Sequence, residues 1–184
     1  MIIFEKTPYG ERNIELQARL FEDRIIWLTS HINAFNAEQI AQQMQILNLQ
    51  DNSNIKFYIN SPGGSVTDGL MIYDIMHTIR PKVDIFCVGQ CCSMAAVLLA
   101  SATGTRYAYE NATIMIHKVS AGTFGKEPDM AISLEHTQAL NDRLMRILAR
   151  NTNKSIEQIY TDTDRDKFFT AREALDYGLV DVMI

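Results

Sequence analysis

The spacing of apolar residues along the chain alternates between the period of a helix and the period of a strand. Ile40, Met44 and Leu47 fall at positions i, i+4 and i+7, which lie on one face of a helix. A capping box that begins at Asn36 precedes them. The pattern therefore predicts an amphipathic helix over 36–49.

The same alternation of strands and helices continues to the end of the chain. Further strands are predicted at 55–59, 83–88, 106–109, 113–117 and 179–183, and further helices at 66–79, 93–102 and 129–151. Capping boxes that start at Ser155 and Thr170 indicate two more helices, and Gly178 is a typical helix stop. The glycine-containing segment 118–128 is expected to be a loop or an extended arm. This order of elements is typical of an α/β domain with a largely parallel sheet.

Composition and charge narrow the class of protein. The chain has 184 residues, of which 47% are hydrophobic and 21% are charged, and it contains no repeat or linker, as expected for one folded domain. Its 17 basic and 22 acidic side chains give a net charge of −5, without any basic cluster. Binding to nucleic acid through a basic face is therefore not expected.

Export and membrane insertion are not expected either. The N-terminal segment carries Glu5 before any long apolar run, unlike a secretory signal, and the longest nearly apolar stretch, 94–102, is about half a membrane span. Cys87, Cys91 and Cys92 crowd together in a way that predicts no disulfide framework. We expect a soluble chain in a reducing, cytoplasmic compartment, with no membrane partner.

Two junctions between a strand and a helix carry the candidate chemistry. They lie at 60–65 and 89–93, at the carboxyl ends of predicted strands, where open α/β sheets bind ligands. Gly63 and Gly64 lack a Cβ and can present backbone amides to an oxyanion, although Pro-Gly-Gly is also an ordinary turn. Ser93 is either a nucleophile or the N-cap of its helix. The residues alone leave both interpretations open.

His117 and the acidic residues near the C-terminus also allow two interpretations. A lone histidine at the end of an apolar run is more often structural than a general base. Four acidic residues within 162–173 match positions of a calcium-loop template, but Lys167 stands where that template needs glycine. A solvated acidic turn is preferred. The histidines lie far apart without ligand partners, so neither a metal nor another cofactor is predicted.

Four motifs that occur here in one order resemble those of a known family: Tyr58-Ile-Asn-Ser-Pro-Gly-Gly64, Gly89-Gln-Cys-Cys-Ser-Met94, Met115-Ile-His117 and Asp162-Thr-Asp-Arg-Asp166. The chain is similar to ClpP, the family of proteolytic subunits of ATP-dependent Clp proteases. The similarity runs from Gly10-Glu-Arg12 to Tyr177-Gly-Leu-Val-Asp181. It implies an α/β, crotonase-like fold of stacked ββα units, with a protruding handle made of a long helix and a strand or loop arm.

The resemblance also implies the catalytic residues. Ser93 would be the nucleophile, His117 the general base, and Asp166 the carboxylate that orients the histidine. These roles are chemically consistent, because a serine hydroxyl needs an imidazole to accept its proton and the imidazole needs an acceptor that fixes its tautomer. The backbone amides of Gly64 and Met94 would form the oxyanion hole.

Partners and assembly are implied by the same resemblance. The apolar pocket that would receive a loop of the ATPase consists of Tyr58, Phe86, Tyr107 and Ile184. The residues that would make contacts between rings are Arg165 and Lys126. The implied ATPase is a Clp-type AAA+ protein of the ClpX, ClpA or ClpC kind. The implied assembly is two stacked heptameric rings, formed by this chain alone or mixed with a second paralogue. The chain would then be one proteolytic domain, 1–184, with an N-terminal axial segment at 1–17 and the handle at 118–151.

Several residues depart from the family pattern. Lys56 stands where an aromatic residue is usual, and Cys91 and Cys92 replace two alanines. Lys118 and Val119 replace glutamine and proline after the implied catalytic histidine. These changes leave the three implied catalytic residues in place and concern the substrate cleft and the choice of ATPase.

Three functions remain as hypotheses. The first is an active serine endopeptidase subunit that degrades unfolded polypeptide delivered by a Clp ATPase. The second is a specialised paralogue that is weakly active alone and serves as a subunit of a mixed ring. The third is a crotonase-fold acyl-CoA enzyme, against which the Ser, His and Asp set argues.

Overall fold

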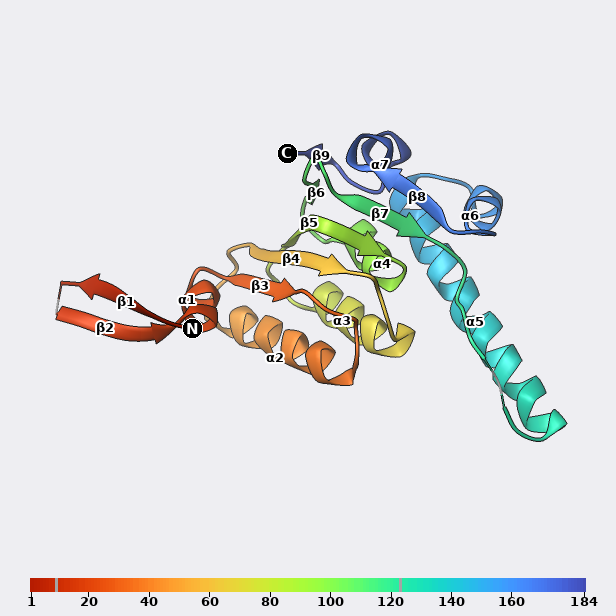
Figure 1. Cartoon of the computed structure of the whole chain (residues 1–184), viewed down its shortest axis with the longest axis horizontal. Coiled ribbons are helices and arrows are strands. Elements are labelled where there is room, and N and C mark those ends of the chain that lie inside the picture. Colours follow the sequence, from red (N-terminus) through yellow and green to blue (C-terminus); the bar gives the residue numbers. More distant parts are fainter. Residues whose placement is uncertain (9, 123) are drawn as a thin grey trace.

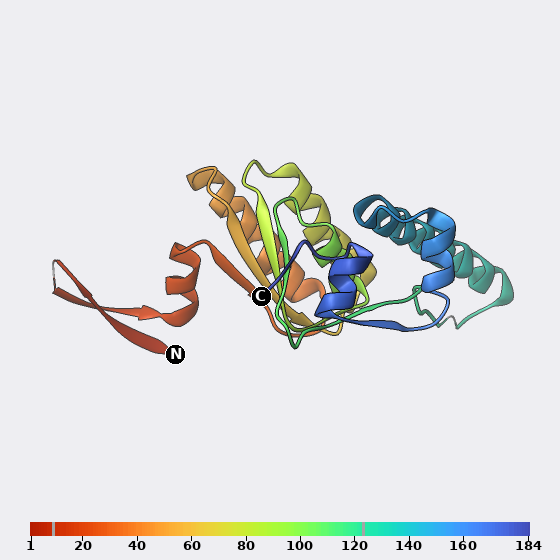
Figure 2. The same cartoon turned by 90° about the horizontal axis from the view of Figure 1, so that it is seen from above.

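A mostly parallel sheet forms the centre of the molecule (Figures 1 and 2). The computed structural model describes residues 1–8, 10–122 and 124–184. The sheet contains, in spatial order, β3 (Ile25–Leu28), β4 (Ile55–Ser61), β5 (Val83–Cys92), β6 (Arg106–Ala108) and β9 (Val182–Met183). Two more strands, β7 (Thr113–Ile116) and β8 (Lys167–Thr170), extend it, with β7 parallel to the end of β5 and β8 antiparallel to β7. A separate antiparallel hairpin, β1 (Ile2–Thr7) and β2 (Gly10–Glu15), projects at one end of the molecule.

The helices cover the sheet and extend beyond it. They are α1 (Leu16–Glu22), α2 (Ala34–Gln50), α3 (Val66–Thr78), α4 (Met94–Ala100), α5 (Glu127–Thr152), α6 (Ile156–Asp162) and α7 (Ala171–Tyr177). Helices α2 and α3 pack side by side against one face of the sheet (Figures 1 and 2). Three alternate residues of β4 are fully buried: Ile55, Phe57 and Ile59. Met44 and Leu47 of α2 are buried in the same core. This agrees with the two-residue period of a strand and the 3.6-residue period of a helix. The predicted α/β class with a largely parallel sheet is confirmed.

Two predicted boundaries are wrong. The capping box of α2 is formed by Asn33 and Asn36, not by a box that begins at Asn36, because each side chain bonds the backbone N–H of the other at 3.0 to 3.1 Å. The final strand is restricted to Val182–Met183, because Gly178 ends α7 in a left-handed conformation at φ 95° and the chain then turns before it pairs again. In both cases the difference is a few residues at the end of an element.

The other two predicted caps are present. Ser155 caps α6 by accepting from the N–H of Gln158 at 3.1 Å, but the Gln158 side chain turns to Asp162, so the box is incomplete. At α7 the box is complete, since Thr170 and Glu173 each accept from the backbone of the other. Caps of this kind satisfy N–H groups that a helix end leaves open.

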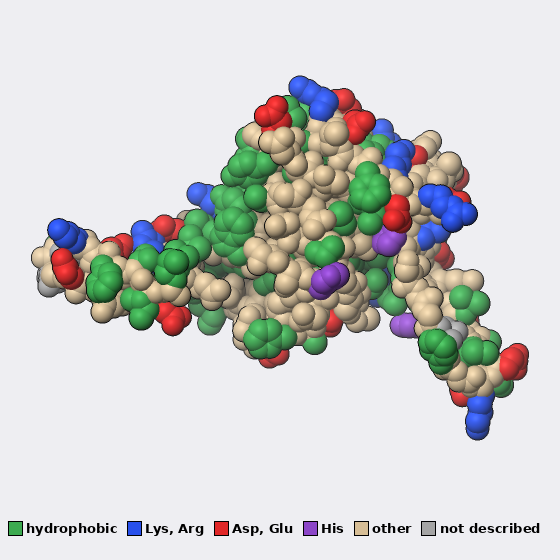
Figure 3. All heavy atoms as spheres, in the orientation of Figure 1, with side chains coloured by type: hydrophobic (Ala, Val, Ile, Leu, Met, Phe, Trp, Pro, Cys, Tyr) green, Lys and Arg blue, Asp and Glu red, His purple; other side chains and the backbone are tan. Residues whose placement is uncertain are grey.

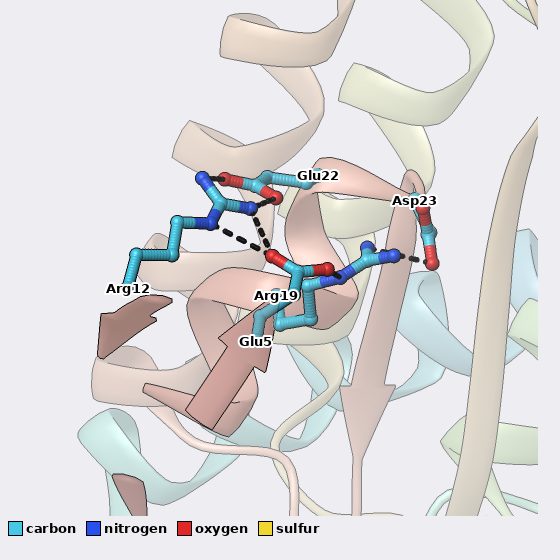
Figure 4. A network of polar contacts seen from close by, with 5 residues as sticks. All are labelled: Glu5, Arg12, Arg19, Glu22 and Asp23. Carbon is cyan, nitrogen blue, oxygen red and sulfur yellow. Dashed lines mark hydrogen bonds and ion pairs between the residues drawn. The ribbon is translucent and has the colours of Figure 1, made fainter. Parts of the chain in front are cut away.

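Charged side chains tie the N-terminal hairpin to α1. Arg12 lies 2.6 Å from Glu5 and 2.7 Å from Glu22, while Arg19 lies 2.9 Å from Glu5 and 2.8 Å from Asp23 (Figure 4). Hydrogen bonds from the two arginines hold the pKa of Glu5 below its ordinary value. Because solvent reaches these side chains, the network orients the hairpin more than it stabilises the fold.

Helix α5 leaves the body of the molecule in its first half (Figure 1). Its buried residues, among them Leu144 and Leu148, all lie in the second half. The side chains of Phe124 and Ile132 are 100% and 67% exposed. Within the described residues, no helix has the length and hydropathy of a membrane span. The exposed apolar side chains of the projecting half, and of the segment directly before it, indicate a surface for another protein.

Arg106 joins the C-terminal elements to the sheet. It donates to both carboxylate oxygens of Asp181, at 2.9 and 2.5 Å, and to the carbonyls of Asn151 and Gly178 at 2.8 and 2.7 Å. These bonds hold the pKa of Asp181 below the ordinary value of 3.8. One guanidinium thus fastens the ends of α5, α7 and β6 together.

We expect Asp181→Asn to lower the free energy of unfolding by about 1–2 kcal/mol near neutral pH, because the charge-assisted bonds to Arg106 are lost. The folded-state pKa of Asp181 lies below the unfolded value, so this contribution is present above about pH 4 and is lost as the pH falls through the folded pKa. Urea unfolding measured across this range should show the two proteins converging in acid. Equal stability at neutral pH would contradict the expectation.

Candidate active site

The junction between β5 and α4 holds Ser93 in an unusual conformation. The segment 89–92, predicted as a turn, instead continues β5, because Gly89 at φ 77° allows an irregularity after which the strand pairs with β7. Ser93 then reverses the chain at φ 56° and ψ −125°, which is unfavourable for an L-residue. Its N–H donates to the Met115 carbonyl at 2.8 Å, which fixes the junction to β7. Backbone strain of this kind is concentrated at functional sites.

The side chain of Ser93 does not act as a helix cap. It makes no capping hydrogen bond to α4, and its Oγ lies 2.8 Å from Nε2 of His117 instead. Of the two interpretations of Ser93, the N-cap hydroxyl is therefore wrong. A hydroxyl paired with an imidazole can be deprotonated as it attacks.

Strands β7 and β8 bring His117 and Asp166 together. Their antiparallel ladder ends at the pair Ile116 and Lys167, so the next residues on each side face one another. Nδ1 of His117 lies 3.2 Å from Oδ1 of Asp166, and the side chains are 21% and 59% exposed. A polar cavity of about 510 Å³, bounded by 117–120 and 163–166, opens beside them. Solvent can therefore reach both His117 and Asp166.

The Pro-Gly-Gly turn after β4 lies directly against Ser93. A Cβ added at Gly63, which has φ 95°, would lie 2.7 Å from the Ser93 Cβ, so only glycine fits. Gly64 forms a parallel bridge with Ile32, in which the hydrogen bonds are made by the Gly63 carbonyl and the Ser65 N–H. The N–H of Gly64 therefore points away from Ile32. The N–H of Met94 begins α4 and has no acceptor inside the helix. Among the described residues neither amide has an acceptor, so both remain available to a ligand.

Three free thiols lie in β5, the strand that leads to Ser93. Cys87 and Cys91 are fully buried and Cys92 is nearly so. Burial raises the pKa of Cys91 well above its ordinary value and raises that of Cys92 as well. Because the thiolate is the reactive form, the raised pKa disfavours attack on an electrophile by Cys91 and Cys92 at neutral pH.

The acidic residues of the segment 162–173, which was compared with a calcium loop, each have a different partner. Asp162 lies 2.5 Å from Lys167, and Asp164 lies 2.6 Å from Lys118. Glu173 is used in the cap of α7. In the parts of the chain that the structure describes, no three His, Cys, Asp or Glu side chains are placed to hold a metal ion.

Four aromatic rings form a stack across the face of the sheet opposite α2 and α3. Trp27, Tyr58, Phe86 and Tyr107 occupy one register of β3 to β6, and their ring centroids are 4.7, 4.6 and 4.5 Å apart. Figure 3 shows hydrophobic side chains gathered over these strands. Ile184 follows β9, and its N–H bonds to β6 next to Tyr107. The motifs did not single out Trp27, which a comparison of the strand registers would have placed in this row.

The two residues expected at ring contacts are both exposed. Lys126 directly precedes α5, and Arg165 lies between α6 and β8. Their proposed contacts are with other subunits, so these assignments stay predictions.

Comparison with protein families agrees with the motifs and the geometry. A family model described as Clp protease matches residues 8–184. The matched range includes the strained serine, the histidine and the aspartate, together with all of the central sheet. The resemblance read from the four ordered motifs is therefore confirmed, and the mixed α/β architecture is consistent with the fold of that family. The chain belongs to the Clp protease family.

Proposed function

We propose that this Clp-family peptidase is a serine endopeptidase subunit that hydrolyses unfolded polypeptide through an acyl-enzyme on Ser93. The observation that carries the proposal is the alignment of three side chains. Ser93 Oγ lies 2.8 Å from His117 Nε2, and His117 Nδ1 lies 3.2 Å from Asp166. Both distances suit proton transfer from a nucleophile to a base held by a carboxylate.

Acylation uses each of these groups in turn. Ser93 Oγ bonds to the peptide carbonyl carbon while its proton passes to His117 Nε2. Asp166 keeps the starting proton on Nδ1 and stabilises the imidazolium. We assign the amides of Gly64 and Met94 to the developing oxyanion, since neither has a protein acceptor among the described residues. The C–N bond then breaks, and the leaving amine takes the proton from His117.

Deacylation reverses the roles of the same residues. His117 accepts a proton from a water molecule as the water oxygen attacks the acyl carbon. The bond to Ser93 Oγ breaks, the serine regains its proton from His117, and the new carboxylic acid departs. The polar cavity beside His117 and Asp166 opens to solvent, from which this water can come.

We assign the aromatic stack to the docking of a Clp-type AAA+ ATPase. Tyr58, Phe86 and Tyr107 are partly exposed, and Trp27 and Ile184 are 44% and 48% exposed. A rigid, apolar and aromatic surface of this kind suits an apolar anchor on a flexible loop.

We further propose that the chain is one proteolytic domain over 1–184 that assembles into two stacked heptameric rings. The segment 1–17, which contains Glu5 and Arg12 of the charged network, would face the axial entrance. The segment 118–151 would be the handle, where the exposed side chains of the first half of α5 need an apolar partner. Arg165 and Lys126 would contact the opposite ring.

The serine mechanism is tested by mass spectrometry of the intact chain after treatment with a fluorophosphonate. We expect one adduct per wild-type chain and none on Ser93→Ala, because only a serine activated by a base reacts at an appreciable rate. The three thiols of β5 make the alanine variant a necessary control. Labelling of both proteins would assign the nucleophile to another residue. No labelling of either would favour the specialised paralogue that is competent only within a mixed ring.

A further inference from the structure

One positive side chain borders the aromatic stack on the open face of the sheet. Lys56 lies two residues before Tyr58 on β4, and alternate residues of a strand point to the same side, so both face away from α2 and α3. The two residues are separated by about 6.6–7 Å along the strand. Lys56 is exposed, whereas Phe57 between them is fully buried. The ammonium group and the rings therefore belong to one surface.

The neighbouring carboxylate does not pair with this lysine. Asp84 lies beside Lys56 in the parallel register of β4 and β5. Its Oδ1 accepts the N–H of Thr105 at 2.8 Å, and its Oδ2 accepts the side-chain amide of Asn54 at 2.9 Å. Over residues 1–8, 10–122 and 124–184, no carboxylate forms an ion pair with Lys56, and its ammonium lies over no ring. This part of the chain thus supplies no partner for the charge.

The stack has a positive charge at one border and uncharged side chains at the other. The residues two positions beyond its rings on β4 and β5, and just after β6, are Asn60, Val88 and Tyr109. Lys56 lies on the opposite side, toward the amino ends of the parallel strands. Complementary charges at a docking surface select the partner and fix its register. A segment that covers the rings therefore meets a cation at only one of its ends.

We propose that Lys56 and the aromatic stack together select a docking segment that carries an acidic side chain two residues from its apolar anchor. The spacing follows from the strand, because an extended segment also places every second side chain on one side, about 6.6–7 Å apart. This inference rests on the proposed docking of a Clp-type ATPase on the stack and adds a charge requirement for its loop. A neutral residue at that position leaves the ammonium unpaired, and a basic residue is repelled by it.

The test uses peptides immobilised on a biosensor surface and the full-length protein in solution. All peptides share a leucine-phenylalanine anchor and carry Glu, Gln or Lys two residues before it in one set and two residues after it in the other. We expect wild type to bind the Glu peptide of one set about threefold more tightly than the Gln peptide, as an exposed ion pair provides, and the Lys peptide more weakly still. The preference should vanish at a salt concentration of about 1 M, where the Debye length is about 3 Å.

Variants of two lysines locate the preference. Lys56→Met keeps the rings and the length of the side chain, so it should bind the Glu and Gln peptides equally, at about the affinity of wild type for the Gln peptide. Lys56→Glu should reverse the order in favour of the Lys peptide. Lys82→Met removes another exposed lysine, which precedes β5 and lies four residues from Phe86, and should keep the wild-type preference.

Phe86→Ala separates this inference from the proposed docking itself. If it weakens binding of the Gln peptide while wild type prefers no charge, or if the preference survives in Lys56→Met, docking on the stack stands and the role of Lys56 is overturned. Binding of no peptide, or binding that Phe86→Ala leaves unchanged, overturns both. A Phe86→Ala protein of smaller oligomeric mass by light scattering would show that a second copy of this chain covers the face, and this would also overturn both.

Discussion

Replacing His117 by alanine is expected to lower kcat for an uncharged peptide by about 10⁶-fold with little change in KM. The imidazole is the group within 2.8 Å of Ser93 Oγ that can accept its proton, so without it the serine must attack as a neutral hydroxyl. KM should persist because the substitution leaves the proposed oxyanion donors, the amides of Gly64 and Met94, in place. Steady-state kinetics with a fluorogenic peptide measures both quantities.

Two measurements distinguish the loss of a general base from the loss of folded protein. Thermal unfolding of His117→Ala should match wild type closely, since the side chain is partly exposed and fills no core position. The fluorophosphonate should react with wild type and not with the variant. A variant that keeps more than about one hundredth of wild-type kcat would remove His117 as the general base, because general-base catalysis contributes at least that factor.

The Asp166→Asn variant is expected to lose about 10³ in kcat, less than the ~10⁴ associated with a buried triad aspartate. Asparagine keeps the size of the side chain but cannot stabilise an imidazolium, and its amide can present a donor to Nδ1 and so select the wrong tautomer. The smaller figure follows from solvent, which reaches the 59% exposed carboxylate and replaces part of its effect. Single-turnover acylation would show the loss in the chemical step.

The outcome for Asp166 also decides between two assignments of the acidic residues. Asp162 shares the same stretch but is occupied by Lys167, Gln158 and Tyr177, so Asp162→Asn should affect stability more than the rate of acylation. If Asp162→Asn lowered acylation and Asp166→Asn did not, the carboxylate assignment would be wrong.

The pattern of residues predicted the elements whose burial is local and periodic. The helix predicted at 36–49 is α2 and the one at 66–79 is α3, each within two residues, because their apolar positions line one buried face. The first 35 residues yielded no predicted element. The strand β2 is almost entirely exposed, so its residues carry no alternation of apolar and polar positions.

Features that depend on pairing distant segments could not be read from the sequence. The end of β5 resembles a turn and continues as a strand only because β7 pairs with it. His117 and Asp166 each had an ordinary structural interpretation, and it is the register of β7 against β8 that places them opposite one another. The resemblance to the family motifs supplied the proposed roles of His117 and Asp166, which the periodicity of apolar residues could not indicate. Neither the periodicity nor the motifs predicted the contact between Lys118 and Asp164, because it depends on the same register and on a lysine that departs from the family pattern.

The positive φ of Ser93 costs folding stability that a glycine at this position would not cost. Glycine adopts a positive φ freely, whereas serine in such a conformation costs about 1–3 kcal/mol of folding stability. Random substitution followed by selection for stability alone would therefore replace this serine by glycine. This chain has kept a hydroxyl here, facing an imidazole. Under the proposed serine mechanism, this cost is offset by the chemistry that the hydroxyl performs, whereas a subunit that only filled a place in a ring would gain nothing from it.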